Sequence, residues 1–558
     1  MQIIVSDKTV LWHFILFSKD VDHTHIEINK YDLVFFNYMM KMKYNYIKRF
    51  ILLAIVFLGT SVYCWSGAYD YILMLFRFYG GNNPYAVLTG WQWSSVGPSD
   101  VNPSYALELS KRDTLKIPMH VWELENLYWV TTIGDSALNK CLMRSVHCPL
   151  TLESIGRKAF KNCNNLSEIR IPNPENLKSI GDSAFLNCYN LKSFVIPTSV
   201  SIINAGTFSG CESLDSIDIP IGVLSIKEYA FKGCGIKSIY IPETVQSLSP
   251  LSFCQNPIES ITVSSANNAF DSRNNCNAVI ETERDNLVFG CKNTLIPNSV
   301  RSIGDFAFIY CVGLNQISIP YYVDNIGNSS FQNCTDLKHV SFPKYLRTIG
   351  DKAFYNCSGL TQISIPNYVT NIGKSAFRDC SALSQIEISS LITTINDSVF
   401  SGCSSLIQIT IPDSVTSIGN NAFYNCTGLI SITIPNHVSN IGKESFGNCH
   451  NLNSIYCQNP EPPECNFDAF SGVNYESCRL FVPKGSVNLY KHKFPWMLFT
   501  IVDLSADVND DGEVNIADIN TVIDCILKGN QISTSDVNCD GEVNIADINV
   551  IIDCILKG

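Results

Sequence analysis

The sequence predicts an α/β repeat protein, in which a solenoid of 23-residue coils is followed by a small α-helical domain. Two observations lead to this fold class. From Leu314 onward the chain repeats every 23 residues with almost no slippage, and one 12-residue loop occurs twice within the last 52 residues. A repeat of this length that contains a short apolar strand is typical of a stacked solenoid, because one coil alone cannot bury its apolar side.

The repeat has the consensus L-x-x-I-x-I-P-x-x-V-x-x-I-G-x-x-A-F-x-x-C, and it recurs upstream at 22–25-residue spacing back to about Ile133. L-x-x-I-x-I at this period is the leucine-rich-repeat signature, with one short strand per coil. We expect the Pro to end the strand and Gly350 and its equivalents to permit a turn that a Cβ would hinder. The whole pattern, including the I-P and A-F-x-x-C elements, resembles BspA-like leucine-rich repeat proteins of bacterial surfaces over about residues 107–503.

Aromatic and thiol side chains form two fixed columns in the repeat. The Phe column is expected to fill the wide side of each coil: Phe308, Phe331, Phe354, Phe377, Phe400, Phe423 and Phe446. The Cys column, for example Cys334 and Cys357, favours a buried ladder of reduced thiols over a zinc site, which needs clustered Cys and His. Cys276/Cys291 and Cys465/Cys478 lie outside this column and are the disulfide candidates in an oxidising compartment.

Two segments interrupt the repeats at 107–451. The segment 258–300 is interpreted as a coil with a β-hairpin-like insertion. The segment 452–503 loses the consensus and becomes rich in Pro and aromatic residues. Because the end of a solenoid must be covered, the sequence predicts a C-terminal cap there.

The duplicated loop has the sequences DVNDDGEVNIAD (Asp507–Asp518) and DVNCDGEVNIAD (Asp536–Asp547), offset by 29 residues. Oxygen-bearing side chains at positions 1, 3, 5, 9 and 12, with Gly at position 6, match the spacing that a calcium ion needs. The sequence therefore predicts two calcium ions. The side-chain ligands would be Asp507, Asn509, Asp511, Asn515 and Asp518 in one loop, and Asp536, Asn538, Asp540, Asn544 and Asp547 in the other, with the carbonyls of Glu513 and Glu542 at position 7.

Each loop leads directly into a helix, and position 12 is Asp where an ordinary EF-hand has Glu. In the first helix one buried stripe is expected, formed by Ile516, Ile519, Val522, Ile523, Ile526 and Leu527. This loop–helix, linker, loop–helix plan resembles a dockerin domain over 507–558, within a predicted domain 504–558. The resemblance implies docking onto a cohesin domain of a scaffold protein.

Loop positions 10 and 11 separate this chain from the best-known clostridial dockerins, which have hydroxyl residues that contact cohesin there. The equivalent cohesin-contact candidates here are Ile516, Ala517, Ile545 and Ala546, so a clostridial-type specificity is not expected. The two 23-residue copies differ at only three positions. Docking through either copy is therefore a hypothesis.

The N-terminal region predicts export. Basic residues precede the apolar run Phe50–Trp65, which is shorter than a membrane span, so residues 42–65 are interpreted as a signal peptide. A membrane anchor is the alternative, and a lipid anchor is disfavoured because Tyr63 is large before Cys64. Residues 1–41 are interpreted as a mis-called extension before Met42. The N-terminal region 66–106 contains no motif.

Charge excludes one class of partner and supports the metal sites. Residues 507–558 contain 11 acidic and two basic side chains, a balance of −9 out of the chain's −12. The rest of the chain is near neutral and has no basic patch, so nucleic acid is not an expected partner.

Catalytic motifs and space for a catalytic domain are both lacking in the sequence. The solenoid offers a surface instead, since Tyr322, Tyr345 and Tyr368 follow the strand in three consecutive coils beside columns of Gln, Ser and Thr. Such a strip suits a protein or glycan of a host, microbial or plant surface, although an ordinary solvated face is the alternative.

The sequence thus predicts a secreted or cell-surface, non-enzymatic binding or adhesion protein that couples to a cohesin-bearing scaffold through calcium. Many dockerin-bearing proteins are glycoside hydrolases, so a component of a polysaccharide-degrading complex with hydrolase activity is the second hypothesis. A structural spacer is the third.

Overall fold

A computed structural model describes residues 2–6, 9–13, 26–28, 61–64, 71–79, 85–94, 114–123, 126–503, 508–509, 511, 513–528, 535, 537 and 543–556. The chain divides into two compact units, 1–111 with 118–134, and 112–117 with 135–558. The predicted signal peptide lies outside the described residues except for β4 (Ser61–Cys64).

The first unit contains two sheets, in which the strands pair antiparallel except for β6 and β9, which pair parallel. One sheet is formed by β1 (Gln2–Ser6), β2 (Thr9–His13) and β3 (Ile26–Ile28). In the other, β5 (Tyr71–Tyr79) pairs with β4 and with β6 (Tyr85–Ser94), and β9 (Asn126–Ile133) pairs with β6 and β8 (His120–Glu123). The region 66–106, in which the sequence shows no motif, therefore contains a long hairpin.

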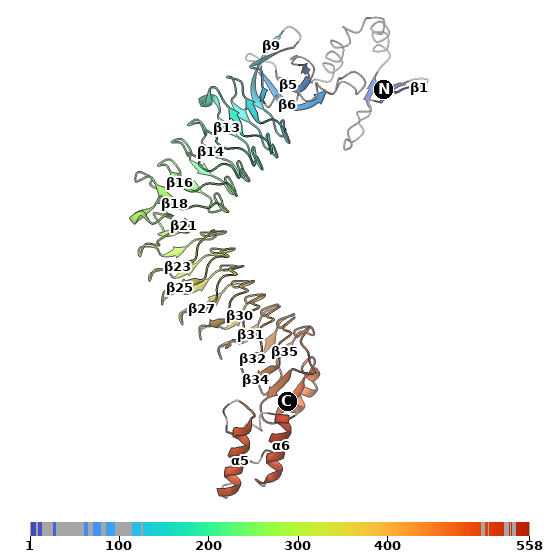
Figure 1. Cartoon of the computed structure of the whole chain (residues 1–558), viewed down its shortest axis with the longest axis vertical. Helices are drawn as coiled ribbons and strands as arrows, with labels where there is room; N and C mark the ends of the chain where they lie inside the picture. Colours follow the sequence, from blue (N-terminus) through green and yellow to red (C-terminus); the bar gives the residue numbers. More distant parts are fainter. Residues whose placement is uncertain are drawn as a thin grey trace, which may run out of the picture. The chain divides into compact units, whose positions relative to one another are not determined.

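The second unit is the predicted solenoid, and its coils follow one another along the chain (Figure 1). Each coil has two parallel-sheet sides and a third side made of turns. The sheet after the repeat's Leu contains β7 (Thr114–Lys116), β10 (Ser145–His147), β12 (Glu168–Arg170), β16 (Ser238–Ile241), β18 (Ser260–Val263), β23 (Gln316–Ser318), β25 (His339–Ser341), β27 (Gln362–Ser364), β29 (Gln385–Glu387), β32 (Ser431–Ile434), β34 (Ser454–Cys457), β36 (Arg479–Val482) and β37 (Thr500–Asp503).

The second sheet side is shorter in every coil. It contains β11 (Ser154–Ile155), β13 (Ser179–Ile180), β14 (Ile202–Ile203), β15 (Ser225–Ile226), β17 (Ser247–Leu248), β22 (Ser302–Ile303), β24 (Asn325–Ile326), β26 (Thr348–Ile349), β28 (Asn371–Ile372), β30 (Thr394–Ile395), β31 (Ser417–Ile418), β33 (Asn440–Ile441) and β35 (Glu464–Cys465). Its register advances by one repeat per coil: Asn325 pairs with Thr348, and Thr348 pairs with Asn371. The α/β-repeat prediction with 23-residue coils is confirmed.

Backbone hydrogen bonds link the turns of the third side from coil to coil, as from Phe354 N to Ala376 O at 2.8 Å, and polar side chains add to them. The backbone N–H of Asp351 donates to Asn328 Oδ1 at 2.8 Å, and that of Lys374 donates to Asp351 Oδ1 at 2.7 Å. Asn356 Nδ2 likewise donates to Asn333 Oδ1 at 2.9 Å. Side-chain oxygens thus accept from the next coil where the turn leaves backbone donors without a strand partner.

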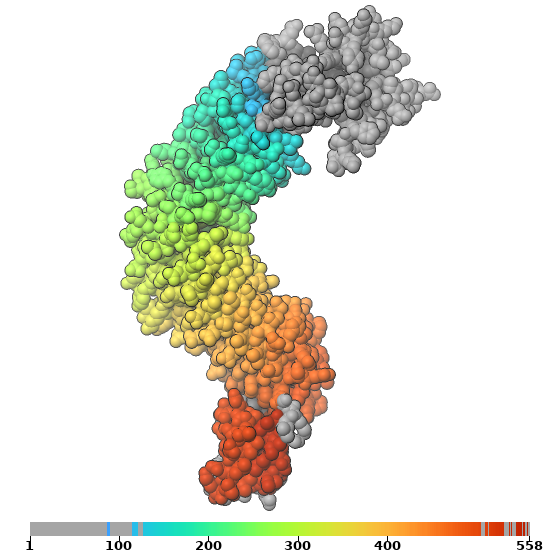
Figure 2. Space-filling model, viewed as in Figure 1, coloured from blue at the N-terminus to red at the C-terminus, as the bar shows by residue number. Residues whose placement is uncertain are grey.

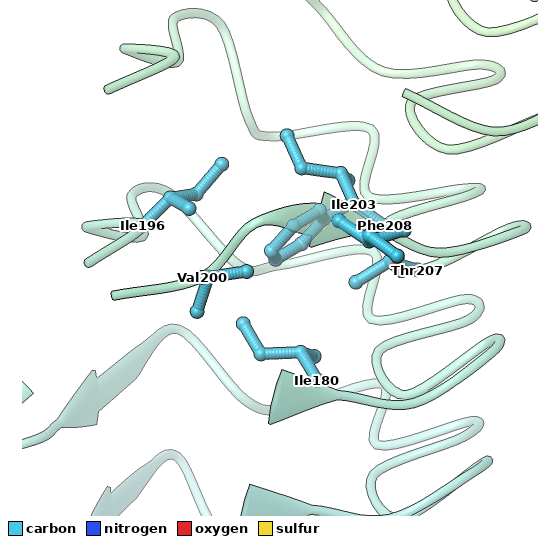
Figure 3. A pocket seen from close by; sticks show the side chains of 7 residues that line it. Ile180, Ile196, Val200, Ile203, Thr207 and Phe208 are labelled. Carbon is cyan, nitrogen blue, oxygen red and sulfur yellow. The ribbon is translucent and has the colours of Figure 1, made fainter. Parts of the chain in front are cut away.

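Stacked Phe rings form the centre of the solenoid, as the repeat predicts. Phe354 lies 5.1 Å from Phe331 and 5.4 Å from Phe377 between ring centroids, with interplanar angles of 2° and 3°. Successive parts of the chain form successive bands along the solenoid (Figure 2), so each coil packs mainly on its neighbours. The side chains of the core pack tightly. A small space bounded by Ile180, Val200 and Phe208 has no room for a water molecule (Figure 3).

The Cys column has a polar role in addition to its packing role. Most thiols of the column donate to the carbonyl of the Phe in the preceding coil, as Cys357 Sγ does to Phe331 O at 3.1 Å and Cys380 Sγ to Phe354 O at 3.1 Å. Both disulfide candidate pairs are free thiols in the structure. Cys276 and Cys291 instead approach the carbonyls of Ala278 at 3.8 Å and Asn277 at 3.5 Å.

A hairpin interrupts the repeat within 258–300. β20 (Ala278–Glu281) pairs antiparallel with β19 (Phe270–Asp271) and with β21 (Asn286–Gly290), which then pairs parallel with β22. Phe289 of β21 continues the aromatic core beside Phe253, at 6.0 Å between ring centroids. The short 3₁₀ turns η2 (Pro174–Asn176) and η3 (Arg273–Asn275) lie between coils and before β20.

The last Phe of the column, Phe470, is covered by Trp496 at 5.3 Å and Phe499 at 5.1 Å between ring centroids. These residues belong to the segment with α4 (Val487–Lys491) and η4 (Trp496–Leu498). Trp496 is fully buried, and its Nε1 donates to Pro463 O at 3.0 Å, so its one polar atom is satisfied.

Two helices, α5 (Ile516–Lys528) and α6 (Ile545–Leu556), follow the solenoid. Val508, Val522, Val537 and Ile551 form a small buried core shared by the two loop–helix copies. Val508 and Val537 occupy one loop position, and Val522 and Ile551 one helix position, so each copy contributes equally.

Candidate functional site

The first predicted calcium loop is organised around the carboxylate of Asp518, which is fully buried. Its Oδ1 accepts from the backbone N–H groups of Val508 at 2.7 Å and Asn509 at 3.2 Å, and its Oδ2 accepts from that of Asn515 at 2.8 Å. The last ligand position therefore ties the start of the loop to the first turn of α5. This burial arises because Asp518 lies inside the helix, one turn before the core residue Val522.

The other described ligand candidates of this loop bond to the loop backbone. Asn509 Oδ1 accepts from the Asp511 N–H at 2.9 Å, and Asp511 Oδ1 accepts from the Glu513 N–H at 2.9 Å. Asn515 Oδ1 accepts from the Ala517 N–H at 2.7 Å and caps the start of α5. The side-chain oxygens at positions 3, 5 and 9 are thus held at the loop by its own N–H groups.

The second loop repeats this arrangement where it is described. Asp547 is fully buried, and its Oδ2 accepts from the Asn544 N–H at 2.8 Å. Asn544 Oδ1 accepts from the Ala546 N–H at 2.8 Å. The remaining predicted ligands lie outside the described residues: Asp507, Asp536, Asn538, Asp540 and Glu542.

The described residues fit a hard cation by their chemistry. Every described ligand candidate offers oxygen, the donor that calcium prefers. Asp518 is a buried carboxylate bonded to backbone N–H groups, and a buried anion normally needs a counter-charge. Among the described residues no group of three or more His, Cys, Asp and Glu side chains is placed to hold a metal ion, so the site would depend on the Asn and backbone oxygens as well.

The apolar residues of α5 divide between two faces, and the prediction of one buried stripe is wrong for Ile516, Ile526 and Leu527. Val522 is buried and Ile519 and Ile523 are half-buried, but Ile516 is 70% exposed and Leu527 is 78% exposed. Ile523 follows Ile516 by seven residues, and Leu527 follows Ile523 by four. At this spacing the three side chains lie on one face of the helix, which α6 does not cover.

The same exposed position recurs in α6. Ile545 is 72% exposed, and Ala517 and Ala546 are half-buried next to the two exposed isoleucines. The four predicted cohesin-contact residues therefore lie at equivalent places at the starts of the two helices. The two copies thus expose an apolar side chain at the same position.

The tyrosines of the solenoid form a continuous exposed strip that includes one residue the sequence analysis missed. Tyr322, Tyr345 and Tyr368 are exposed by 54%, 39% and 47%. Tyr321 lies 5.2 Å from Tyr322 and 5.3 Å from Tyr345, and Tyr345 lies 5.1 Å from Tyr368, between ring centroids. The sequence did contain a signal for Tyr321. The position after the repeat's Pro is Lys344 and Asn367 in the next two coils, so an aromatic residue at this position is unusual.

Fold and sites together define a leucine-rich repeat solenoid joined to a small paired loop–helix module. Comparison with protein families matches residues 131–277, 290–407 and 370–494 to the BspA type leucine rich repeat region (6 copies) and residues 505–556 to the dockerin type I domain. The chain belongs to the BspA type leucine-rich repeat family and has a C-terminal dockerin type I domain. Both predicted resemblances are confirmed.

Solved structures with the same repeats are similar over most of the chain. A leucine rich cell surface protein from Faecalibacterium prausnitzii is 26% identical, with a TM-score of 0.44, and the match covers 74% of this chain and 98% of that one. A leucine-rich repeat protein from Bacteroides ovatus is 26% identical, with a TM-score of 0.43, covering 79% and 100%. The pneumococcal vaccine antigen PcpA is 17% identical, with a TM-score of 0.49, covering 79% and 98%. The comparison with curated proteins found no match. Within the described part of the chain, no helix is both long and apolar enough to span a membrane.

Proposed function

We propose that this protein is exported and non-enzymatic, that its solenoid recognises a surface protein or glycan, and that its calcium-loaded dockerin attaches it to a cohesin-bearing scaffold. The observation that supports the docking half is the pair of exposed isoleucines, Ile516 and Ile545. Each lies at position 10 of its loop, two residues before the buried Asp that occupies the last ligand position.

Calcium has a structural role in this proposal. When bound, the ion supplies positive charge to the loop oxygens. Asp518 and Asp547 then fix the start of each helix, because both carboxylates bond to N–H groups within their own loops. The exposed position 10 of each loop lies between ligand positions 9 and 12. A bound ion would therefore hold Ile516 and Ile545 in place for the partner.

The solenoid half is supported by the Tyr strip. Four exposed rings in contact give a rigid aromatic surface beside the polar strand residues Gln316, Ser318 and Gln362. Aromatic rings with nearby amide and hydroxyl groups suit both sugars and protein surfaces.

A direct test measures binding of the full-length protein to a panel of immobilised cohesin domains. We expect binding in calcium that is abolished by a chelator. Because the two helices are nearly identical, Ile516→Asp or Ile545→Asp alone should change affinity by less than about three-fold. The double variant should lose about 100-fold or more, as for central interface anchors. Leu295→Asp, at a 77%-exposed leucine of the solenoid, is the matched control and should have no effect. Failure of every cohesin to bind, or unchanged binding by the double variant, would contradict the docking proposal.

A further inference from the structure

A cavity of about 520 Å³ opens on the turn side of the solenoid, away from the strand-to-strand turns that contain the Tyr strip. Four consecutive coils contribute to its walls. Its lining includes two aromatic rings, Tyr310 and Tyr355, the amides Gln332, Asn333 and Asn356, and the cations Lys352 and Arg378. The lining contains aromatic, amide and cationic groups but no aliphatic side chain.

Tyr310 is exceptional in its repeat column. It has a φ of 55°, and the equivalent positions with positive φ are mostly Asn, Gly or Asp, as at Asn333, Asn356 and Gly402. Those residues adopt left-handed backbone readily, whereas a bulky side chain there is strained. Among the described residues, Tyr310 is the one aromatic side chain at this position of the column, and its ring lines the cavity.

The amides of the cavity already have fixed orientations. Asn356 Nδ2 donates to Asn333 Oδ1 at 2.9 Å across the coil boundary. A side-chain amide has two N–H donors and an oxygen with two lone pairs, so both residues retain capacity for a ligand. Donors and acceptors at neighbouring fixed positions match the adjacent hydroxyl groups of a sugar.

The charge of the cavity is positive, although the chain as a whole has a net charge of −12. Lys352 and Arg378 line it without a carboxylate in the lining. Asp379 approaches Arg378 at 3.5 Å from outside the lining, and the Arg378 guanidinium lies 5.9 Å from the centre of the Tyr355 ring. One cation therefore remains in excess for an anionic ligand group.

We propose that this cavity binds a carboxylate-bearing sugar residue of an acidic polysaccharide. The tyrosine rings contact the C–H face of the sugar, and the Asn and Gln amides bind its hydroxyl groups. Lys352 binds its carboxylate, because Arg378 is already paired with Asp379. An acidic peptide is the less favoured occupant, because it would use the cations but not the amide pair. The site is independent of the docking proposal, since the coils that form it are separate from the dockerin.

The test is calorimetric titration of the full-length protein with trigalacturonate, its methyl ester, a glucuronate-containing hyaluronan hexasaccharide and hexaglutamate. We expect one or both acidic oligosaccharides to bind at least 10-fold more tightly than the ester and the peptide. The preferred oligosaccharide then identifies a plant or an animal source. No binding of either acidic sugar, or equal binding of the ester or of hexaglutamate, would overturn the proposal.

Variants separate this site from the rest of the solenoid. Tyr310→Asn restores the residue that the column has elsewhere, so the fold should be retained while affinity falls at least 10-fold. Tyr355→Gln introduces the residue found at Gln332 and should act in the same direction. Tyr424→Gln is the matched control, because Tyr424 occupies the position of Tyr355 three coils later, outside the cavity. Unchanged binding by Tyr310→Asn with an unchanged melting temperature would overturn the proposal.

Discussion

The solenoid and the dockerin both consist of repeated units, but they are stabilised in different ways. In the solenoid most coils add a Phe ring, a thiol and a turn amide to columns that extend over many neighbours. In the dockerin two copies share one core of Val508, Val522, Val537 and Ile551. A domain this small rarely gains enough stability from its core alone. We therefore expect the solenoid to be stable without a ligand and the dockerin to depend on calcium.

Alkaline pH should produce the largest difference between the two regions. Burial raises the pKa of Cys334 and Cys380 to about 12. A thiol in the unfolded chain ionises near pH 8.5, so the stabilisation is complete below that pH and is lost as the pH rises toward the folded value. Each thiol whose pKa is raised in this way then costs on the order of 1.4 kcal/mol of unfolding free energy per pH unit in this range.

The urea midpoint of the solenoid under reducing conditions should therefore fall steeply between pH 8 and pH 9.5. A triple variant with Ala at Cys334, Cys357 and Cys380 should show a shallower decrease. Equal slopes in the two proteins would show that the thiols do not determine the pH dependence.

Phe354→Ala should give the next largest effect. The substitution removes a fully buried ring stacked on both sides, so we expect a loss of about 3–5 kcal/mol in the free energy of unfolding. Chemical denaturation followed by circular dichroism measures it. Calcium binding by the dockerin should be unchanged, and a loss below about 1 kcal/mol would contradict the ring-stacking account.

The substitution Asp518→Asn tests how the dockerin is stabilised. It removes the charge of the carboxylate that accepts from three backbone N–H groups. We expect the free energy of unfolding of the dockerin to fall by about 1–3 kcal/mol. We also expect the variant to lose one of the two calcium sites. Asp524→Asn is the control on the same helix, because Asp524 is exposed and pairs with Lys528 on the surface. Titration calorimetry should give one ion for the first variant and two for the second. An unchanged stoichiometry for Asp518→Asn would exclude Asp518 as a ligand.

The smallest effect on stability is expected in the Tyr strip. Tyr321→Ala removes an exposed ring that joins Tyr322 to Tyr345, so stability should change by less than about 0.5 kcal/mol. Adhesion to the recognised surface should nevertheless fall, and Ala at Tyr322, Tyr345 and Tyr368 together should abolish it. Unchanged adhesion by the triple variant would favour a solvated face or a spacer role.

Sequence predicts the repeated features of this protein well, because each is sampled once per coil. The period, the Phe column and the burial of Cys334 and Cys357 all follow from it. The hydrogen bonds of the thiols do not, because the acceptor is a backbone carbonyl 26 residues away that leaves no mark in the sequence. The Asn333–Asn356 ladder was missed for a similar reason, since an amide in a turn is equally explained by its backbone conformation.

Unique features were predicted less well. The helical period alone could not separate the buried face of α5 at Val522 from the exposed face at Ile516 and Leu527, because both faces are apolar. The difference depends on where α6 packs. The free state of Cys276, Cys291, Cys465 and Cys478 likewise depends on tertiary contacts that no local pattern records. The long hairpin in the region 66–106 had a local signal that was missed, because two β-rich runs, Tyr71–Tyr79 and Tyr85–Ser94, flank a Gly-Gly-Asn-Asn-Pro segment.

Calcium titration of the full-length protein, followed by a cohesin pull-down with and without chelator, tests the central claim most directly. We predict two bound calcium ions and a cohesin complex that dissociates when the chelator removes them. A protein that binds no calcium, or that holds its cohesin equally well in chelator, would contradict the account.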